Sequence, residues 1–278
     1  LFKRNCQTKQ ERSSLLITDG AMCSATQTTK DDTKDNSNNF KIFLGRIFMF
    51  YYYGRKKLLA DKYPEPVGDM IIEPFAGSAA YSLANNRWQK EVILYDDYFV
   101  VVEIWKYLIQ ASKIDILRLP DLKQGDDLRN IQTLSDVEKW LIGFHINPGS
   151  PTPKNIATKM NRWGAGKKYI ADNIHKVKHW RVFQSDYIKI NENRENITWF
   201  IDPPYDKQGV FYAKNSTNIN YNDLANFCIT RKGMVIVCEN FGAGWLPFRS
   251  FATTKSCGTR KSIEAIWTNF DNDERFLF

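Results

Sequence analysis

The chain has 278 residues, of which 43% are hydrophobic and 25% are charged, a balance that allows a sizeable core and excludes wholesale disorder. No apolar run approaches the roughly 20 residues of a membrane-spanning helix, and five scattered cysteines with only three histidines argue against a disulfide scaffold or a metal site. The formal net charge of +8 favours an acidic polymer as a partner.

The N-terminal part differs from the rest of the chain. Residues 1–39 include 17 Ser, Thr, Asn or Gln residues and have no apolar periodicity, so burial cannot offset their ordering entropy. We predict a disordered tail there. Residues 40–53 are apolar but interrupted by Lys41 and Arg46. A buried strand or helix edge explains this run better than a signal sequence, since no small-residue cleavage site follows. The chain begins with Leu1, and Met49 is an alternative start.

From Pro64 onward, short continuous apolar runs alternate with segments in which apolar residues recur at helical spacing. They predict strands at 69–73, 92–95, 181–183, 198–201, 234–239 and 262–267, and helices at 77–85, 98–111 and 221–231. Asn220 or Asn222 is the candidate cap of the last helix. Strand, tight turn, helix and strand in succession are typical of a parallel α/β sheet.

The middle of the chain, residues 112–182, has no strong strand pattern. Ser135 and Glu138 have the spacing of a capping box, which predicts a helix that continues to about Ile146. A turn rich in proline and glycine follows at 147–153. We interpret this region as an inserted helical domain.

Basic residues concentrate in one part of that insertion. Residues 154–181 hold eight basic residues and one acidic residue, which accounts for the whole basic excess of residues 40–278. Basic and aromatic side chains together suit phosphate contact and base stacking, and a solvated helix face is the alternative. The candidate nucleic-acid-binding residues are Lys159, Arg162, Trp163, Lys167, Lys168, Lys176 and Lys178.

The first chemical motif is the segment EPFAGSA at 73–79, between a predicted strand and a predicted helix. Gly77 has no Cβ, so a ligand can lie against the turn. Asp96 follows at the end of the next strand and could accept hydrogen bonds from ribose hydroxyls, as in nucleoside-cofactor sites. By local pattern alone, ordinary strand–helix packing remains an alternative.

The second motif, WFIDPPY at 199–205, is more specific. A buried strand ends in Asp202, and then Pro203 and Pro204 fix the backbone and leave their carbonyls as acceptors. Tyr205 adds a flat ring. Two acceptors beside an aromatic face suit a planar group that carries an NH₂.

EPFAGSA and DPPY, in this order, resemble the Dam-type DNA N6-adenine methyltransferases, and more narrowly their phage and prophage members. The resemblance covers about residues 49–267. It includes the upstream segment YYGRK at 52–56 and the segment SDY at 185–187, and places an insertion between the two main motifs. It implies a Rossmann-like methyltransferase sheet, with a catalytic domain at 40–111 and 183–278 and a target-recognition domain at 112–182.

The resemblance also implies roles for particular residues. S-adenosylmethionine would be held by Tyr52, Gly54, Lys56, Glu73, Phe75, Gly77, Asp96 and Asp186, with Asp96 at the ribose and Asp186 at the adenine. Asp202 and the Pro203 carbonyl would accept hydrogen bonds from the target amino group, with Pro204 beside them, and Tyr205 would stack on the flipped base. The chain departs from the family pattern at Ala79, where a second glycine is usual, and at Arg55, where a small residue is common.

The implied activity is transfer of a methyl group to adenine N6 in duplex DNA, without a metal, in the cytoplasm of a bacterium or a phage-infected cell. RNA adenine stays open as the acceptor, and so does a catalytically silent nucleic-acid-binding protein. Family members that act on cytosine N4 tend to have Ser in place of Asp202, which argues against that acceptor. The polar segment 206–220 is interpreted either as a lid that orders on DNA or as a surface loop.

Several further residues are assigned minor roles. Asn240 is a candidate border of the base pocket. Cys228 and Cys238 are interpreted as packing residues. The three histidines, His145, His175 and His179, are interpreted as structural or phosphate-facing rather than catalytic.

Overall fold

The computed structural model describes residues 48–54, 56, 58–192, 194–207, 212–213, 216–255 and 261–270. The predicted tail at 1–39 and Arg55 lie outside these residues. None of the described helices is long and apolar enough to cross a membrane.

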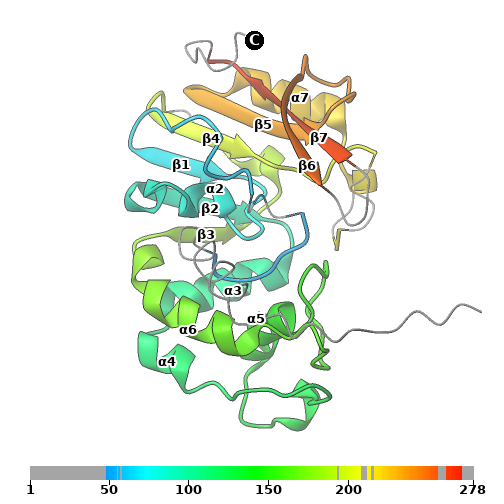
Figure 1. Ribbon diagram of the computed structural model, residues 1–278. Coiled ribbons are helices and arrows are strands. Elements are labelled where there is room, and N and C mark those ends of the chain that lie inside the picture. Colours follow the sequence, from blue (N-terminus) through cyan, green and yellow to red (C-terminus); the bar gives the residue numbers. More distant parts are fainter. Residues whose placement is uncertain are drawn as a thin grey trace, which may run out of the picture. The chain divides into compact units, whose positions relative to one another are not determined.

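Seven strands form one sheet: β1 (Met70–Glu73), β2 (Glu91–Asp96), β3 (Arg181–Gln184), β4 (Ile197–Ile201), β5 (Met234–Asn240), β6 (Arg249–Lys255) and β7 (Lys261–Thr268). Their order across the sheet is β3-β2-β1-β4-β5-β7-β6 (Figure 1). The first five strands in this order are parallel, and β7 runs antiparallel to both of its neighbours. This topology confirms the predicted α/β fold class with a Rossmann-like sheet.

The strand order reverses between β1 and β4, which are direct neighbours. In open parallel sheets, ligands bind beyond the carboxyl ends of the strands at such a switch point. Glu73 ends β1, Asp96 ends β2, and Asp202 follows the last residue of β4. The topology therefore brings three carboxyl groups, far apart in sequence, to one edge of the sheet.

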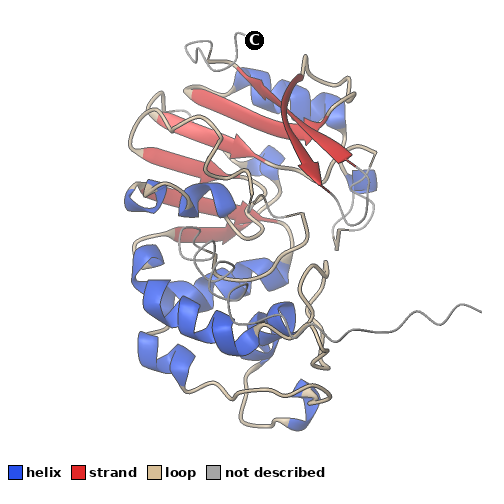
Figure 2. Ribbon diagram, viewed as in Figure 1, coloured by secondary structure: helices blue, strands red, loops and turns tan. Residues whose placement is uncertain are grey.

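The helices are α2 (Ala80–Leu83), α3 (Phe99–Gln110), α4 (Lys113–Leu117), α5 (Asp136–Ile146), α6 (Trp163–Asn173) and α7 (Tyr221–Thr230). Short 3₁₀ turns lie at Arg87–Gln89, Leu128–Asn130, Ile174–Val177, Tyr187–Lys189 and Ser216–Asn218. Helices α4, α5 and α6 gather beyond the β3 edge of the sheet, next to α3 (Figure 2).

Two apolar clusters cover the two faces of the sheet. Alternate strand residues such as Ile71 and Phe200 share one cluster with α3 and with the helices of the insertion. Residues of the opposite parity, such as Ile72 and Trp199, pack against α7 in the other cluster. Side chains alternate between the faces of a strand, so the central strands β1, β4 and β5 are buried on both sides, whereas β3 at the edge of the sheet is mostly exposed. The core of the insertion is thus continuous with the core of the sheet.

The strands and helices predicted from Pro64 onward are confirmed, with two differences, whereas the described part of the run 40–53, residues 48–53, forms neither a strand nor a helix. The helix predicted at 77–85 is reduced to the single turn of α2, because Gly77, Ala79 and Asn85 adopt left-handed backbone conformations with φ of 45°, 47° and 49°. Strand β6 was not predicted. It lies at the edge of the sheet and has a register shift between Ser250 and Ala252, which interrupts the alternation that marks a strand.

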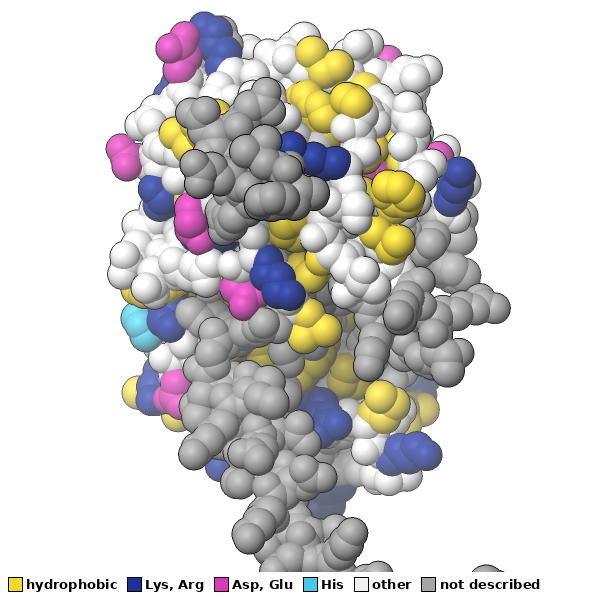
Figure 3. Space-filling view, turned by 45° about the horizontal axis from the view of Figure 1, so that its top comes forward, with side chains coloured by type: hydrophobic (Ala, Val, Ile, Leu, Met, Phe, Trp, Pro, Cys, Tyr) yellow, Lys and Arg dark blue, Asp and Glu magenta, His cyan; other side chains and the backbone are white. Residues whose placement is uncertain are grey.

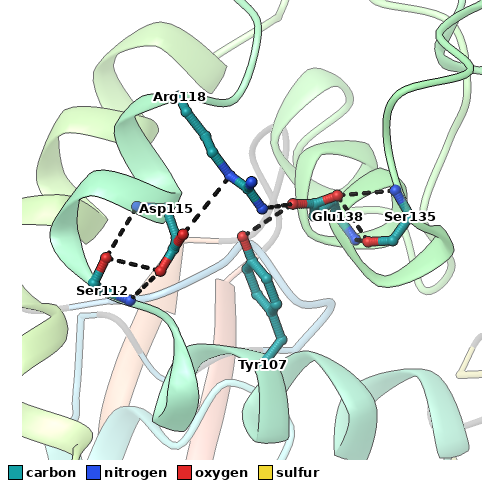
Figure 4. Close-up of polar contacts among 6 residues, drawn as sticks. All are labelled: Tyr107, Ser112, Asp115, Arg118, Ser135 and Glu138. Carbon is teal, nitrogen blue, oxygen red and sulfur yellow. Dashed lines mark hydrogen bonds and ion pairs between the residues drawn. The ribbon is translucent and has the colours of Figure 1, made fainter.

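The capping box predicted at the start of α5 is confirmed and belongs to a larger polar network (Figure 4). Glu138 accepts hydrogen bonds from the backbone N–H and hydroxyl of Ser135, both at 2.8 Å. Its other oxygen lies 3.1 Å from the guanidinium of Arg118, which also lies 3.8 Å from Asp115 of a second capping box on α4. The Tyr107 hydroxyl of α3 donates to Glu138 at 3.4 Å. One buried carboxylate therefore joins three helices.

We expect Glu138→Ala to lower the free energy of unfolding by roughly 2 kcal/mol, because it removes the acceptor of the capping box together with the contacts to Tyr107 and Arg118. Asp115→Ala, the equivalent change in the capping box on α4, is the matched control. Its side chain is 42% exposed against 6% for Glu138, so water can replace its contacts. Urea unfolding measures both variants. An equal loss in the two variants would contradict a joining role for Glu138.

Candidate active site

A pocket lies at the carboxyl edge of β1, β2 and β4. All eight residues that the sequence predicted as cofactor ligands line it: Tyr52, Gly54, Lys56, Glu73, Phe75, Gly77, Asp96 and Asp186. Asp202 and Pro204 of the DPPY motif line the same pocket, whereas Pro203 and Tyr205 are not among the described residues of its wall. The structure therefore brings the glycine turn and the DPPY carboxylate into one cavity.

The glycine turn is held from both sides. The N–H of Gly77 donates to Asp96 Oδ2 at 2.9 Å, and its carbonyl accepts from the indole N–H of Trp105 in α3, also at 2.9 Å. A Cβ on Gly77 would lie 3.0 Å from the ring of Tyr52, on a left-handed backbone that disfavours side chains. Ala79, the departure from the family pattern, is also left-handed, so it adopts a conformation that glycine would adopt without strain.

Asp96 fixes the backbone of this turn through hydrogen bonds. Its second oxygen accepts the N–H of Tyr98 at 2.8 Å, so both oxygens hold backbone amides. Burial raises the pKa of Asp96 to about 6, although the two amide hydrogen bonds oppose the rise. Asp97, which is exposed, lines the pocket beside it. Both carboxyl groups line the predicted ribose side of the pocket, and the role of Asp96 at a ribose stays a prediction.

Glu73 is buried below the glycine turn. It accepts hydrogen bonds from the N–H and the hydroxyl of Ser82, at 3.0 and 2.5 Å. Burial raises its pKa to about 8, against the lowering effect of the two Ser82 bonds. Near neutral pH the side chain is therefore largely a neutral acid, which can donate one hydrogen bond into the pocket.

This shift makes stability depend on pH. A group with a pKa raised on folding stabilises the folded state below its unfolded pKa, and this contribution is lost as the pH rises toward the folded value. We expect Glu73→Gln to remove a stability loss of about 3 kcal/mol between pH 5 and pH 8. Chemical denaturation across this range measures it, with the exposed Glu195→Gln as control. Parallel curves for the variant and the parent would show that Glu73 is ionised throughout.

Residues 52–56, the N-terminal segment of the site, form one side of the pocket, apart from Arg55, which lies outside the described residues. The ring of Tyr212 packs against Tyr53 and Tyr52, with centroids 5.1 and 6.3 Å away. Gly54 is left-handed, with φ of 72°, and a Cβ there would lie 1.7 Å from the Tyr212 hydroxyl oxygen. This position therefore requires glycine. Tyr212 belongs to segment 206–220, so the described part of that segment lines the pocket, although 208–211 and 214–215 lie outside the described residues.

The predicted adenine end of the pocket is aromatic. Phe75 packs against Tyr187, with ring centroids 5.4 Å apart, and Ile219 lines the wall nearby. Asp186 lines the pocket as well and accepts the N–H of Ile188 at 3.1 Å, which fixes its side chain at the start of a short 3₁₀ turn. Its contact with an adenine stays a prediction.

At the DPPY corner, one lysine serves two carboxylates. Lys56 Nζ lies 2.9 Å from Asp202 Oδ1 and 3.3 Å from Glu264 Oε1, and its side chain is only 8% exposed. Burial acts to lower the pKa of Lys56, but the two carboxylates outweigh it and hold that pKa well above its ordinary value. Burial raises the pKa of Asp202 to about 6, while Lys56 lowers it and Glu264 raises it further. Lys56 is thus a permanent cation beside two acids.

Tyr205 lies behind Asp202 rather than in the pocket wall. Its hydroxyl donates to Glu264 at 2.5 Å and accepts a hydrogen bond from Lys56, whose ammonium lies 4.2 Å from the ring centroid. One ring face is therefore covered by a cation here, and stacking on a base stays a prediction. The next residues are held by Glu239, which accepts the N–H of Asp206 at 3.1 Å, and by Tyr221, which donates to the Pro204 carbonyl at 2.5 Å.

Two acidic residues of this corner, Glu264 and Glu239, were missed by sequence reasoning. Both are almost fully buried and end or interrupt apolar strands. A carboxylate within an otherwise apolar strand run, as in SIEAIW at 262–267, is the signal that could have marked Glu264.

The candidate nucleic-acid residues do not share one surface. Trp163 is fully buried and donates its indole N–H to the Pro120 carbonyl, so its predicted role in base stacking is corrected to core packing. Lys167 is buried and pairs with Asp121 at 2.6 Å, and Lys178 donates to carbonyls at the end of α3. Lys176 bonds to Asn173 and lies over the ring of Trp88. The exposed candidates are Lys159, Arg162, Lys168 and Lys178, the last of which is engaged with these carbonyls.

The structure also places the cysteines, the buried histidine and the asparagine that were assigned minor roles. Cys228 and Cys238 are buried, and burial raises the pKa of both thiols, as packing residues require. His145 is buried with Nε2 3.2 Å from the Met49 carbonyl, which is a structural position. Asn240 accepts a hydrogen bond from Ser262 at 3.1 Å and is not among the described residues that line the pocket. No group of three potential metal ligands occurs in the described part of the chain.

Comparison with known proteins gives structural similarity only. No protein-family model matches the sequence, and a search of curated proteins finds no match. The chain is similar to the rRNA methyltransferase aviRa from Streptomyces viridochromogenes, at 10% identity and a TM-score of 0.35, over 73% of this chain and 78% of that one. It is also similar to a protein from Haemophilus influenzae described as a methylase, at 10% identity and a TM-score of 0.34, over 87% and 90%. At these scores the fold assignment rests on the strand order of the sheet.

Proposed function

We propose that the chain is an S-adenosylmethionine-dependent methyltransferase that acts on the exocyclic N6 of adenine in DNA. The observation that carries the proposal is the shared pocket, where the Gly77 turn and Asp202 line one cavity although 125 residues separate them in sequence. A turn that allows close backbone approach and a carboxylate at a proline-fixed corner are the two parts that this reaction needs.

The residues of the pocket fit the cofactor. Gly77 leaves a surface without a side chain, Asp96 and Asp97 offer carboxylates for ribose hydroxyls, and Phe75 and Tyr187 offer apolar ring surface for a purine. When bound, S-adenosylmethionine supplies a sulfonium methyl group that a nitrogen lone pair can attack. The chain itself supplies the hydrogen-bond acceptors for the reacting amine.

In this proposal, the DPPY corner makes the exocyclic amine of the target adenine more nucleophilic. The lone pair of an aromatic amine is conjugated with its ring, so the amine is a poor nucleophile. Hydrogen bonds from its two N–H groups to Asp202 and to the Pro203 carbonyl favour a pyramidal nitrogen with an available lone pair. The nitrogen then forms its bond to the methyl carbon while the carbon–sulfur bond breaks, with the electron pair going to sulfur, and the nitrogen releases one proton. Positioning and electrostatics supply most of the acceleration.

The acceptor must leave the duplex to reach this corner, which costs a few kcal/mol. Lys159, Arg162 and Lys168 are exposed and are the candidates for phosphate contact. Among the described residues visible in Figure 3, Lys and Arg side chains are scattered and form no continuous basic patch on that face. Because phosphate contacts by such side chains release counterions, we expect the affinity for DNA to fall as the salt concentration rises.

The test is methyl transfer from labelled S-adenosylmethionine to duplex DNA and, in parallel, to structured RNA, followed by digestion to nucleosides. Label in N6-methyl-2′-deoxyadenosine of the DNA sample supports the proposal. Label only in the RNA sample makes the chain an RNA methyltransferase. Salt-dependent DNA binding without label in either sample makes it a catalytically silent binding protein, and either of these results overturns the proposal.

A further inference from the structure

A cluster on the inner side of the DPPY corner contains two acidic side chains but one basic side chain. It joins Lys56, Asp202 and Tyr205 to two residues that the proposed chemistry does not use, Tyr63 and Glu264. Neither of these two lines the pocket in the described part of the chain. The cluster holds two carboxyl groups around one ammonium, an arrangement whose burial costs desolvation free energy.

Glu264 is the residue on which these contacts converge. Its Oε1 accepts hydrogen bonds from Tyr63 at 3.0 Å and from Tyr205 at 2.5 Å, and lies 3.3 Å from Lys56 Nζ. Asp202 faces the same ammonium at 2.9 Å, yet its Oδ1 has no well-aligned hydrogen bond among the described residues. The two carboxylates therefore compete for one cation, and Glu264 holds the additional donors.

We propose that Glu264 is a positioning residue that draws part of the charge of Lys56 away from Asp202, and so keeps Asp202 a strong hydrogen-bond acceptor for the reacting amine. This inference rests on the proposed function. If Lys56 paired with Asp202 alone, the ammonium would occupy that carboxylate and weaken it as an acceptor. With Glu264 present, the corner retains one net negative charge beside a nitrogen that becomes cationic during methyl transfer. The proton that the nitrogen then releases passes to Asp202.

The charged and titratable groups that face Asp202 determine in which direction its pKa changes when one of them is replaced. They are Lys56 from the N-terminal segment, Glu264 from β7, Cys238 from β5, Glu73 from β1, and Tyr63, Tyr205 and Tyr212 from loops. Glu264 raises the pKa of Asp202, and Lys56 lowers it. Removal of the Glu264 charge should therefore lower the pH at which Asp202 titrates, because Lys56 then pairs with Asp202 alone.

The experiment is a carbon-13 NMR titration of the free protein labelled at its aspartate carboxyl carbons. The Asp202 signal is assigned as the one absent from Asp202→Asn. We expect Glu264→Gln to lower the Asp202 midpoint by about one pH unit. Tyr63→Phe should raise it, because a carboxylate with one donor fewer attracts Lys56 more strongly. The exposed Glu91→Gln, which pairs only with Arg181 among the described residues, is the control and should leave the midpoint unchanged.

The same variants are then compared in methyl transfer. We expect the acid limb of the kcat profile to move with the Asp202 midpoint, downward for Glu264→Gln and upward for Tyr63→Phe, with KM for the cofactor nearly unchanged. If Glu264→Gln does not fold, the upward shift in Tyr63→Phe still tests the inference. An unmoved Asp202 midpoint in the folded variants overturns it, whatever the activity. Absence of methyl transfer by the parent protein refutes the proposed function instead, together with the catalytic consequence of the NMR shift.

Discussion

Replacement of Asp202 by asparagine is expected to lower kcat for methyl transfer by roughly 10²–10³-fold, the usual effect of losing one preorganised electrostatic group. Asparagine has nearly the same shape but no charge, and in one orientation it presents an NH₂ to the incoming amine. The ammonium of Lys56 keeps Glu264 as a partner at 3.3 Å, so we expect the fold to persist. Steady-state kinetics and a melting curve measure the two effects separately.

The matched control for this variant is Asp206→Asn, four residues further along the same loop. Asp206 is exposed, and its contact in the structure is made by its backbone N–H to Glu239. We expect kcat to change less than twofold there, in line with a surface substitution. Similar losses of kcat in both variants would indicate that removal of any carboxylate in this loop lowers the activity. Such a result would contradict the specific role of Asp202.

Replacement of Lys56 by methionine should have the largest effect on stability, a loss of about 3–5 kcal/mol at neutral pH. Methionine fills the space, but Asp202 and Glu264 then remain buried without their cation. Loss of Lys56 removes an interaction that lowers the pKa of Asp202, so that pKa rises further above its unfolded value. A group of this kind costs stability as the pH rises, so the loss should be smaller near pH 4.5 than near pH 7.5.

Urea unfolding at the two pH values checks this prediction, with Lys62→Met as the control. Lys62 lies on the same segment and is exposed, so its replacement should change the free energy of unfolding by less than about 0.5 kcal/mol. A stability loss in Lys56→Met that is equal at both pH values would show that the buried carboxylates are not the cause.

The sequence was sufficient for the part of the site that lies at the ends of parallel strands. Glu73, Asp96 and Asp202 each follow a short apolar run, and parallel pairing places the ends of such runs at one edge. Glu264 could not be placed in the same way. It reaches the corner because β7 pairs antiparallel with β5, with Glu264 opposite Asn240, and no local pattern specifies that register.

The basic segment shows a second limit of sequence reasoning. Its charge count is correct, but the count does not say which face of α6 is buried. Trp163, Lys167 and Ile170 have helical spacing and point together into the core, where Lys167 donates to the Leu119 carbonyl at 2.9 Å. Application of the same periodicity to this segment would have separated these residues from the exposed Lys168.

The central claim is that the Gly77 turn and the Asp202 corner form one binding site for S-adenosylmethionine, and a crystal structure with S-adenosylhomocysteine tests it most directly. We expect the adenine between Phe75 and Asp186, the ribose at the end of β2, and the sulfur on the side of the pocket that faces Asp202. A ligand bound elsewhere on the chain, or one in this pocket with its sulfur directed away from Asp202, would contradict the claim.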